Sequence, residues 1–162
     1  MIWFISDPHY HHANLVRGTS KWSDKSGCRD FDTIEEHDDW LVNLINAKVK
    51  AVDTLYHLGD WSFGGKSKIR EFRDKLDVGY VILVPGNHDH HLLGMSSKES
   101  GCNLTPSYLE VKLETIPLVL MHYPIESWNN MERGARHLHG HTHGQLPVKS
   151  GRIDVGVDGI GL

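Results

Sequence analysis

The sequence predicts an α/β fold in which two β-sheets pack as a mixed sandwich flanked by helices. Short, continuous apolar runs rich in β-branched and aromatic residues recur along the 162 residues and are typical of buried strands. Segments with helical spacing separate the first three runs, which favours parallel βαβ units. The later runs follow one another without long helices, which favours a second sheet.

Three buried strands are expected in the first half of the chain. They cover residues 1–6, 54–58 and 80–84, and turn-forming or polar residues follow each of them. Residues 7–32, between the first strand and the first helix, lack periodicity and contain many polar residues, so they are expected to form a long loop. A loop of this length in a compact domain is usually functional.

Two helices are expected between these strands. Thr33 and Glu36 match a capping box, and the apolar residues behind them recur at helical spacing, which predicts a helix over 34–48. Ser67 is expected to cap a second helix, whose apolar face contains Ile69, Phe72 and Leu76.

The second half of the chain is expected to be mainly strands. Residues 108–114 alternate between apolar and polar side chains, and residues 116–121 form an antiparallel partner. Residues 136–140 lead into a turn, and residues 152–157 form a closing strand. Because no repeat, linker or composition shift divides the chain, residues 1–162 are expected to form one domain.

The composition is that of an ordinary globular protein and restricts its partners. Hydrophobic residues make up 39% and charged residues 23% of the chain. The net charge is −4 and no basic stripe occurs, so extended nucleic acid is not an expected partner. No apolar run is long enough for a membrane span or a signal peptide, which predicts a cytosolic protein. Cys28 and Cys102 are expected to be ordinary reduced thiols.

Polar clusters directly follow five apolar runs or short lead-in segments. These clusters are Asp7-Pro8-His9, Gly59-Asp60, Gly86-Asn87-His88-Asp89, His122 and Gly140-His141-Thr142-His143. Taken singly, most of them are more simply explained as turn or cap residues. Taken together, they indicate a shared site, because the carboxyl ends of strands in such sheets face a common crevice.

The residue types in these clusters suit a pair of divalent transition-metal ions. The chain contains 13 His, and imidazole together with carboxylate favours manganese, iron or zinc over calcium or magnesium. Asp7 and His9 can face one ion from a single turn, as can His141 and His143, and Asp60 can bridge two ions through its two oxygens. Two ions about 3.5 to 4 Å apart form a clamp for in-line displacement at phosphorus.

The ordered set of clusters resembles the calcineurin-like metallophosphoesterase family, whose pattern reads DxH, GD, GNH(D/E), H and GHxH. The resemblance spans residues 7–143 and implies two sets of metal ligands, with a bridging water or hydroxide as the nucleophile. The first set is Asp7, His9, Asp60 and His143, and the second is Asp60, Asn87, His122 and His141. It also implies that His88 is a general acid or phosphate ligand, with Asp89 orienting it.

More narrowly, the segment from Phe4 to His9, with His12, Asn14 and Leu15 behind it, resembles the small bacterial and phage phosphoesterases of this family. Pro8 stands where those relatives often have Thr, and it removes one backbone N–H donor. Residues 10–31 and 90–107 are expected to form the rim of an open cleft. On that rim Arg17 is a candidate phosphate ligand, with a solvated surface arginine as the alternative.

The expected function is hydrolysis of a small phosphomonoester or phosphodiester, with nucleotide-like substrates included. Two alternatives remain at this point: a nuclease acting on nucleic-acid ends, and a metal-dependent scaffold without catalysis. The acidic balance and the missing basic stripe argue against processive or tight binding of nucleic acid. Retention of His88 beside a complete ligand set argues against the scaffold. The other histidines remain unassigned, and His57 is expected to be a core residue.

Overall fold

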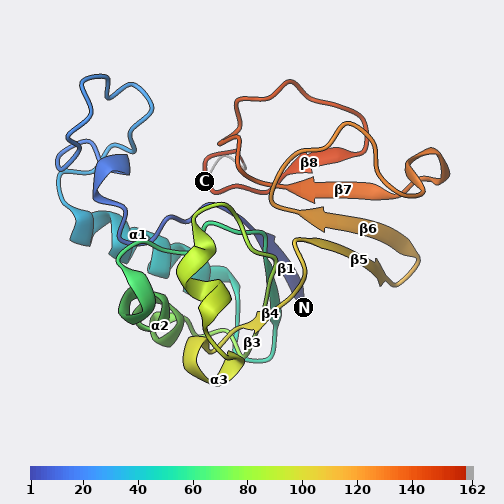
Figure 1. The fold of residues 1–162 in the computed structure, drawn as a ribbon, viewed down its shortest axis with the longest axis horizontal. Coiled ribbons are helices and arrows are strands. Elements are labelled where there is room, and N and C mark those ends of the chain that lie inside the picture. Colours follow the sequence, from blue (N-terminus) through green and yellow to red (C-terminus); the bar gives the residue numbers. More distant parts are fainter. Residues whose placement is uncertain (160–162) are drawn as a thin grey trace.

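The computed structural model describes residues 1–159 and contains two four-stranded sheets (Figure 1). In the first sheet the order is β1 (Ile2–Ile5), β2 (Thr54–His57), β3 (Tyr80–Leu83) and β4 (Asn103–Leu104), and all neighbours are parallel. This confirms the predicted parallel pairing of the first three strands. The strands are short and mainly apolar, as expected where helices connect them and both faces are covered.

The second sheet is mixed and has the order β5 (Tyr108–Leu113), β6 (Ile116–Met121), β7 (Arg136–His139) and β8 (Arg152–Asp154). β5 and β6 form the predicted antiparallel hairpin, in which Leu113 pairs with Ile116 beside the turn. β6 and β7, and then β7 and β8, are parallel. Residues 136–139, which were expected only to lead into a turn, thus pair on both sides as a strand.

The helix α1 (Ile34–Lys48) matches the predicted range and its capping box. The Thr33 hydroxyl accepts a hydrogen bond from the Glu36 backbone N–H, and the Glu36 carboxylate accepts one from the Thr33 N–H. The helix α2 (Gly65–Lys75) begins before Ser67, so the predicted cap at Ser67 is wrong. Gly64 occupies the N-cap with a φ of 91°, a conformation that suits glycine.

Further short elements fill the loops. They are the 3₁₀ turns η1 (Ala13–Leu15), η2 (Asp89–Gly94) and η3 (Met131–Arg133), and the helix α3 (Ser97–Ser100). The expected rim at 90–107 is thus partly helical and also contains β4. A second capping box, formed by Ser96 and Glu99, begins α3.

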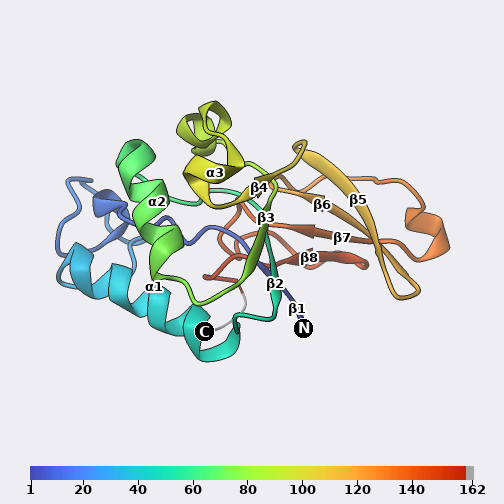
Figure 2. The same cartoon turned by 90° about the horizontal axis from the view of Figure 1, so that it is seen from below.

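The molecule consists of three layers (Figure 2): the helices, the sheet β1–β4, and the sheet β5–β8. One apolar cluster joins the helices to the first sheet and includes Leu41, Phe72 and Leu83. A second cluster joins the two sheets and includes Leu58 and Leu120. This arrangement is the two-sheet α/β sandwich that the sequence predicts. It fixes the direction in which the carboxyl ends of the strands point.

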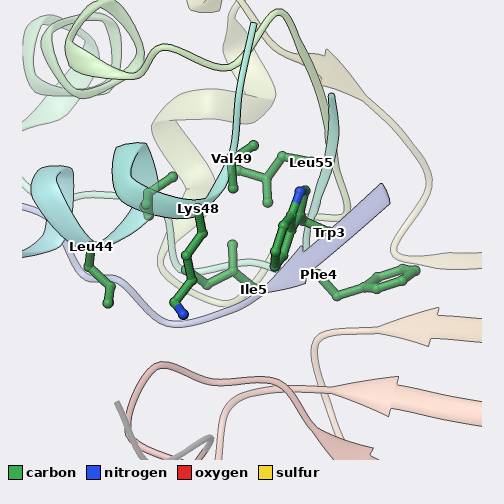
Figure 3. Close-up of a pocket in the computed structure, with 8 residues that line it drawn as sticks. Trp3, Phe4, Ile5, Leu44, Lys48, Val49 and Leu55 are labelled. Carbon is green, nitrogen blue, oxygen red and sulfur yellow. The ribbon is translucent and has the colours of Figure 1, made fainter. Parts of the chain in front are cut away.

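An apolar hollow of about 240 Å³ lies between the end of α1 and β1 (Figure 3). Its lining includes Trp3, Leu44 and Val49, with Lys48 as the only charged residue among those that line it. None of the candidate ligands lines this hollow. Among the described residues, no helix has both the length and the apolarity required to cross a bilayer.

Candidate metal centre

The strand order brings the predicted polar clusters to one edge of the sandwich. Asp7 and His9 follow β1, Asp60 follows β2, Asn87 and His88 follow β3, His122 follows β6, and His141 and His143 follow β7. Backbone hydrogen bonds join neighbouring loops, because the Asp7 N–H donates to the Gly59 carbonyl and the His9 N–H to the Asp60 carbonyl. Ser6 pairs with Gly156 across the two sheets. The loops therefore form one connected surface.

Five of the candidate ligands have a left-handed backbone. Their φ angles are 57° at Asp7, 51° at His9, 59° at Asp60, 67° at His141 and 48° at His143. Among residues 1–159 only three other non-glycine residues share this conformation, namely His11, Glu114 and Asn130. Left-handed backbone is unfavourable for residues with a Cβ and concentrates at functional sites. The backbone is therefore shaped to turn these side chains toward one place.

Two glycines allow the loops to approach closely. A Cβ on Gly140 would lie 2.0 Å from Ser6 Oγ and 2.1 Å from Asp7 Oδ2, and one on Gly86 would lie 2.3 Å from Asp60 Oδ1. No side chain fits at such distances. The glycines before Asn87 and His141 are therefore required by the packing of the carboxylates of Asp60 and Asp7.

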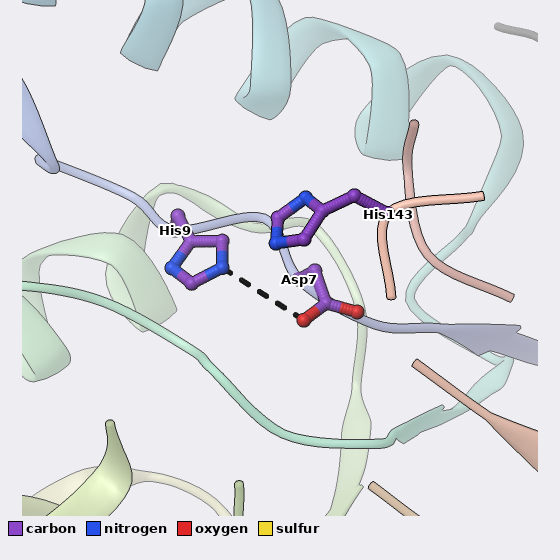
Figure 4. A group of neighbouring side chains, drawn as sticks. All are labelled: Asp7, His9 and His143. Atoms are coloured by element: carbon purple, nitrogen blue, oxygen red, sulfur yellow. Dashed lines mark ion pairs between the residues drawn. The ribbon is translucent and has the colours of Figure 1, made fainter. Parts of the chain in front are cut away.

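Asp7, His9 and His143 form the first group of donor atoms (Figure 4), all within 4.8 Å of one another. His9 Nε2 lies 3.8 Å from Asp7 Oδ1, and the rings of His9 and His143 stack with centroids 5.1 Å apart. Asp7 is fully buried and His9 is 3% exposed. Nevertheless, Asp7 Oδ1 and both ring nitrogens of His9 have no hydrogen-bond partner within residues 1–159. Such atoms are costly to bury unless something binds them.

Asp7, Asp60 and His122 form the second group of donor atoms, again within 4.8 Å. His122 Nδ1 lies 2.8 Å from the Leu58 carbonyl, which can only accept, so Nδ1 carries the hydrogen and Nε2 presents a lone pair. That Nε2 faces Asp60 Oδ2 at 3.5 Å and Asn87 Oδ1 at 3.0 Å. Electron-rich atoms that face one another in this way can together coordinate a cation.

His141 and His88 border these groups and are more exposed. The His141 N–H donates to Asp7 Oδ2 at 2.9 Å, and its ring meets that of His122 edge-on at 5.1 Å. The His88 side chain is 43% exposed, with Nε2 4.0 Å from Asp60 Oδ2. Its backbone N–H donates to Asp60 Oδ1. The His88 ring thus lies beside a buried carboxylate and the His141 ring beside His122, and both residues are exposed.

The electrostatics of the buried groups suit a positive charge. Burial raises the pKa of the Asp7 carboxyl, although His122 and His143 oppose that shift. Burial also lowers the pKa of His9 well below its ordinary value. A neutral imidazole and a carboxylate with a free oxygen are the forms that ligate a divalent cation. The donor set therefore fits the metal ions that the sequence predicts.

Asp158 supports His143 and was not anticipated from the sequence. Its Oδ2 lies 2.7 Å from His143 Nδ1, and this hydrogen bond is the main cause of the raised pKa of His143. Burial alone would raise the pKa of Asp158, but its bonds with His143 and Arg29 outweigh burial and lower it. A single aspartate near the end of a chain, far from any ligand in sequence, gives no signal of such a role.

Two predicted residues have other surroundings than expected. Asp89 is buried and accepts hydrogen bonds from the backbone N–H groups of Asp60, Trp61 and Gly86. It therefore holds two site loops together, and among the described hydrogen bonds none joins it to the His88 ring. Arg17 is half exposed and pairs with Asp30 at 2.9 Å. Its role as a phosphate ligand remains a prediction.

Several of the histidines for which the sequence predicts no role in the site make contacts that support the fold or lie at the surface. His57 is fully buried, accepts the Gly59 N–H, and meets the Trp61 ring at 4.7 Å, as expected of a core residue. His137 lies within hydrogen-bonding distance of the carbonyls of Val119 and Tyr123. The exposed His90 and His91 contact each other in η2.

A groove of about 440 Å³ begins at His143. Its lining combines apolar side chains, polar side chains and one ion pair, and consists of Leu15, Trp22, Ser26, Gly27, Cys28, Arg29, His143, Gln145 and Asp158. Trp22 is 45% exposed, and its ring meets His12 edge-on, while His12 stacks on Phe63 at 3.7 Å. The long loop 7–32 therefore provides one wall of a groove beside the candidate ligands.

Comparison with known proteins places the chain in a family. An uncharacterized protein of Methanocaldococcus jannaschii is 32% identical over 90 residues, which cover 54% of this chain and 46% of that protein. The chain thus spans about half the length of this archaeal relative. The gene 66 protein of Mycobacterium phage L5 is 27% identical, with 98% of this chain and 87% of that protein covered.

A solved structure of similar fold is a protein of unknown function from Aquifex aeolicus. It has a TM-score of 0.67 and 23% identity, with 98% of this chain and 90% of that chain covered. The profile of the calcineurin-like phosphoesterases matches residues 1–135 of the 162. The chain therefore belongs to the calcineurin-like phosphoesterase family.

Proposed function

We propose that this protein hydrolyses a small phosphomonoester or phosphodiester with the help of two divalent metal ions. The observation that carries the proposal is that donor atoms of Asp7, His9, Asp60, His122 and His143 lie close together in two groups. Among them, Asp7 Oδ1 and both ring nitrogens of His9 are buried without a protein partner within the described residues. Unpartnered buried carboxylate and imidazole atoms stabilise neither the fold nor one another. They are accounted for when cations lie between them.

The proposed ligands form two sets that share Asp60. The first set is Asp7, His9, Asp60 and His143, and the second is Asp60, Asn87, His122 and His141. Manganese, iron or zinc suits this mixture of imidazole, carboxylate and amide ligands. Such ions supply an activated water as the nucleophile and neutralise charge on the phosphoryl oxygens.

We assign the transfer of a proton to the leaving oxygen to His88. Its ring is close enough to Asp60 to face a phosphoryl group bound between the two ligand sets, yet it is not itself enclosed by protein. A general acid needs this combination, because it must reach the substrate and regain its proton from solvent. The bond from the His88 N–H to Asp60 Oδ1 fixes the backbone that carries the ring.

We place the alcohol part of the ester in the groove beside His143. The half-exposed ring of Trp22 offers a stacking surface, and Gln145 and Ser26 offer polar partners. A volume of about 440 Å³ lies within the range of about 300 to 1,000 Å³ that is typical of small-molecule sites. A planar organic group of nucleoside size suits this groove better than an extended strand, for which the acidic chain offers no basic track.

The test combines metal loading with two chromogenic esters, p-nitrophenyl phosphate and bis(p-nitrophenyl) phosphate. We expect two manganese ions per chain, hydrolysis that chelation abolishes, and a loss of about 10²- to 10⁴-fold in kcat for His88→Ala with both ions retained. His91→Ala is the matched control, because His91 is an exposed histidine of the neighbouring turn η2. A wild-type protein that binds both ions but hydrolyses neither ester would contradict catalysis and favour a scaffold.

A further inference from the structure

Arg29 lies in the long loop 7–32 and is buried, with only 8% of its surface exposed. A guanidinium group has five N–H donors in a fixed plane, and each of them has an acceptor here. Nε and one Nη2 hydrogen reach the two oxygens of Asp158 at 2.9 and 2.8 Å, and the other Nη2 hydrogen reaches the Asp7 carbonyl at 2.7 Å. Nη1 reaches the Pro8 carbonyl at 2.6 Å and His37 Nε2 at 2.8 Å.

Three of these residues adjoin proposed ligands: Asp7 and Pro8 belong to the turn that carries two of them, and Asp158 is bonded to His143. The carbonyls of Asp7 and Pro8 belong to the strained turn that presents Asp7 and His9. Asp158 is the residue whose carboxylate accepts the His143 Nδ1 hydrogen, so that Nε2 of His143 is left as the free lone pair. One guanidinium group thus joins the turn after β1 directly to Asp158, the residue that supports His143.

The guanidinium group is in turn anchored to α1. An arginine N–H can only donate, so His37 Nε2 accepts and His37 Nδ1 carries the hydrogen, which it shares with Asp38 Oδ1 at 3.1 Å. Burial lowers the pKa of His37, which keeps the ring neutral as an acceptor must be. The Asp38 carboxylate also accepts a hydrogen bond from the His11 backbone N–H and lies within hydrogen-bonding distance of His11 Nδ1. The chain of contacts therefore ends on a capped 15-residue helix.

We propose that Arg29 is a positioning residue that sets the geometry of the ion bound by Asp7, His9 and His143. The inference rests on the proposed function for the presence of that ion. In this role Arg29 does not bind the ion itself and acts through the Asp7 and Pro8 carbonyls and through Asp158. Lysine cannot replace it, because an ammonium group cannot bond two carboxylate oxygens and two carbonyls in one plane.

The experiment measures manganese binding by calorimetry and the visible spectrum of the cobalt-loaded protein for wild type, Arg29→Lys and Asp158→Asn. We expect one of the two manganese ions to bind about 10- to 100-fold more weakly in Arg29→Lys, while the other keeps its affinity. The cobalt spectrum should change in the same variant. Arg73→Lys is the matched control, because Arg73 also donates to backbone carbonyls, at Leu76 and Gly101, but contacts none of the proposed ligands.

Two results would overturn the proposal: wild-type affinity for both ions in Arg29→Lys, or equal weakening of both ions together with a fall in thermal stability. If Arg29→Lys fails to fold, Asp158→Asn decides, because it removes one of the two oxygens that Arg29 and His143 share and leaves the bonds from Arg29 to the two carbonyls. Wild-type binding of both ions by that variant would also refute the role. A wild-type protein that binds no manganese would instead contradict the proposed function.

Discussion

Replacing Gly140 with alanine tests whether the close packing behind Asp7 controls the candidate site. The added Cβ would lie 2.0 Å from Ser6 Oγ and 2.1 Å from Asp7 Oδ2. Ser6 and Asp7 are both fully buried, so neither side chain can move into solvent. Asp7 Oδ2 is also held by the His141 N–H at 2.9 Å. Since the φ of Gly140 is not in the left-handed region, the backbone accepts alanine and the effect is steric.

The expected effect follows from these contacts. Inserting a methyl group into a packed interior costs about 1 to 3 kcal/mol, which corresponds to a fall of about 2 to 12 °C in Tm for a protein of this size. The displaced Asp7 carboxylate should also weaken manganese binding about 10- to 100-fold. Thermal unfolding with and without manganese, and calorimetric titration, measure the two effects separately.

Gly94→Ala is the matched control, because nothing lies within 4 Å of its added Cβ and its φ is also ordinary. This variant should keep the wild-type Tm and manganese affinity. If Gly140→Ala matched the control in both measurements, the loops around Asp7 would be able to relax. The argument that glycine is required there would then be refuted.

Two further predictions concern the groove and the core. Trp22→Ala should raise KM for a nucleotide ester by about 5- to 150-fold, since stacking on an aromatic ring contributes about 1 to 3 kcal/mol. Trp22→Phe should keep most of the affinity. Steady-state kinetics with methyl phosphate, which has no ring to stack, shows whether the rise in KM is specific to stacking. Burial lowers the pKa of His57 to about 3, so the unfolded chain binds a proton there that the folded chain does not, and stability should fall as the pH drops from about 6.5 toward 3. Denaturant unfolding of the metal-free protein at pH 7 and 5 should show a smaller fall for His57→Gln, and an identical fall in both proteins would contradict this.

Much of the fold follows from local patterns in the sequence. The capping pair Thr33 and Glu36 predicts where α1 begins, and the alternation over 108–114 predicts the hairpin of β5 and β6. The strand β7 was missed because its sequence, Arg-His-Leu-His, contains one aliphatic residue and no apolar run. Its two buried histidines are held by backbone carbonyls, and that compensation is visible only in the folded chain.

The candidate site was predictable in its donors and unpredictable in its supports. Asp7, His9 and Asp60 follow neighbouring parallel strands, so the topology of that sheet brings them together. His122 follows a strand of the second sheet, and the packing of the two sheets adds it to the group. Arg29 and Asp158 have no such mark, because their partners are carbonyl groups and side chains distant in sequence. Asp89 was placed correctly beside the site but given the wrong partner, since a carboxylate that binds three backbone N–H groups looks in sequence like any other acid.

The strained backbone explains why those supports are needed. Five proposed ligands with positive φ each carry a cost on the order of 1 kcal/mol, and a free loop would relax to avoid it. Bonds from the Asp7 and His9 N–H groups to the neighbouring loop, and from Arg29 to the carbonyls of Asp7 and Pro8, hold the first turn on both sides. Strain at a metal site is therefore expected wherever ligands from separate strands must face one point, and the residues that maintain it lie behind the ligands.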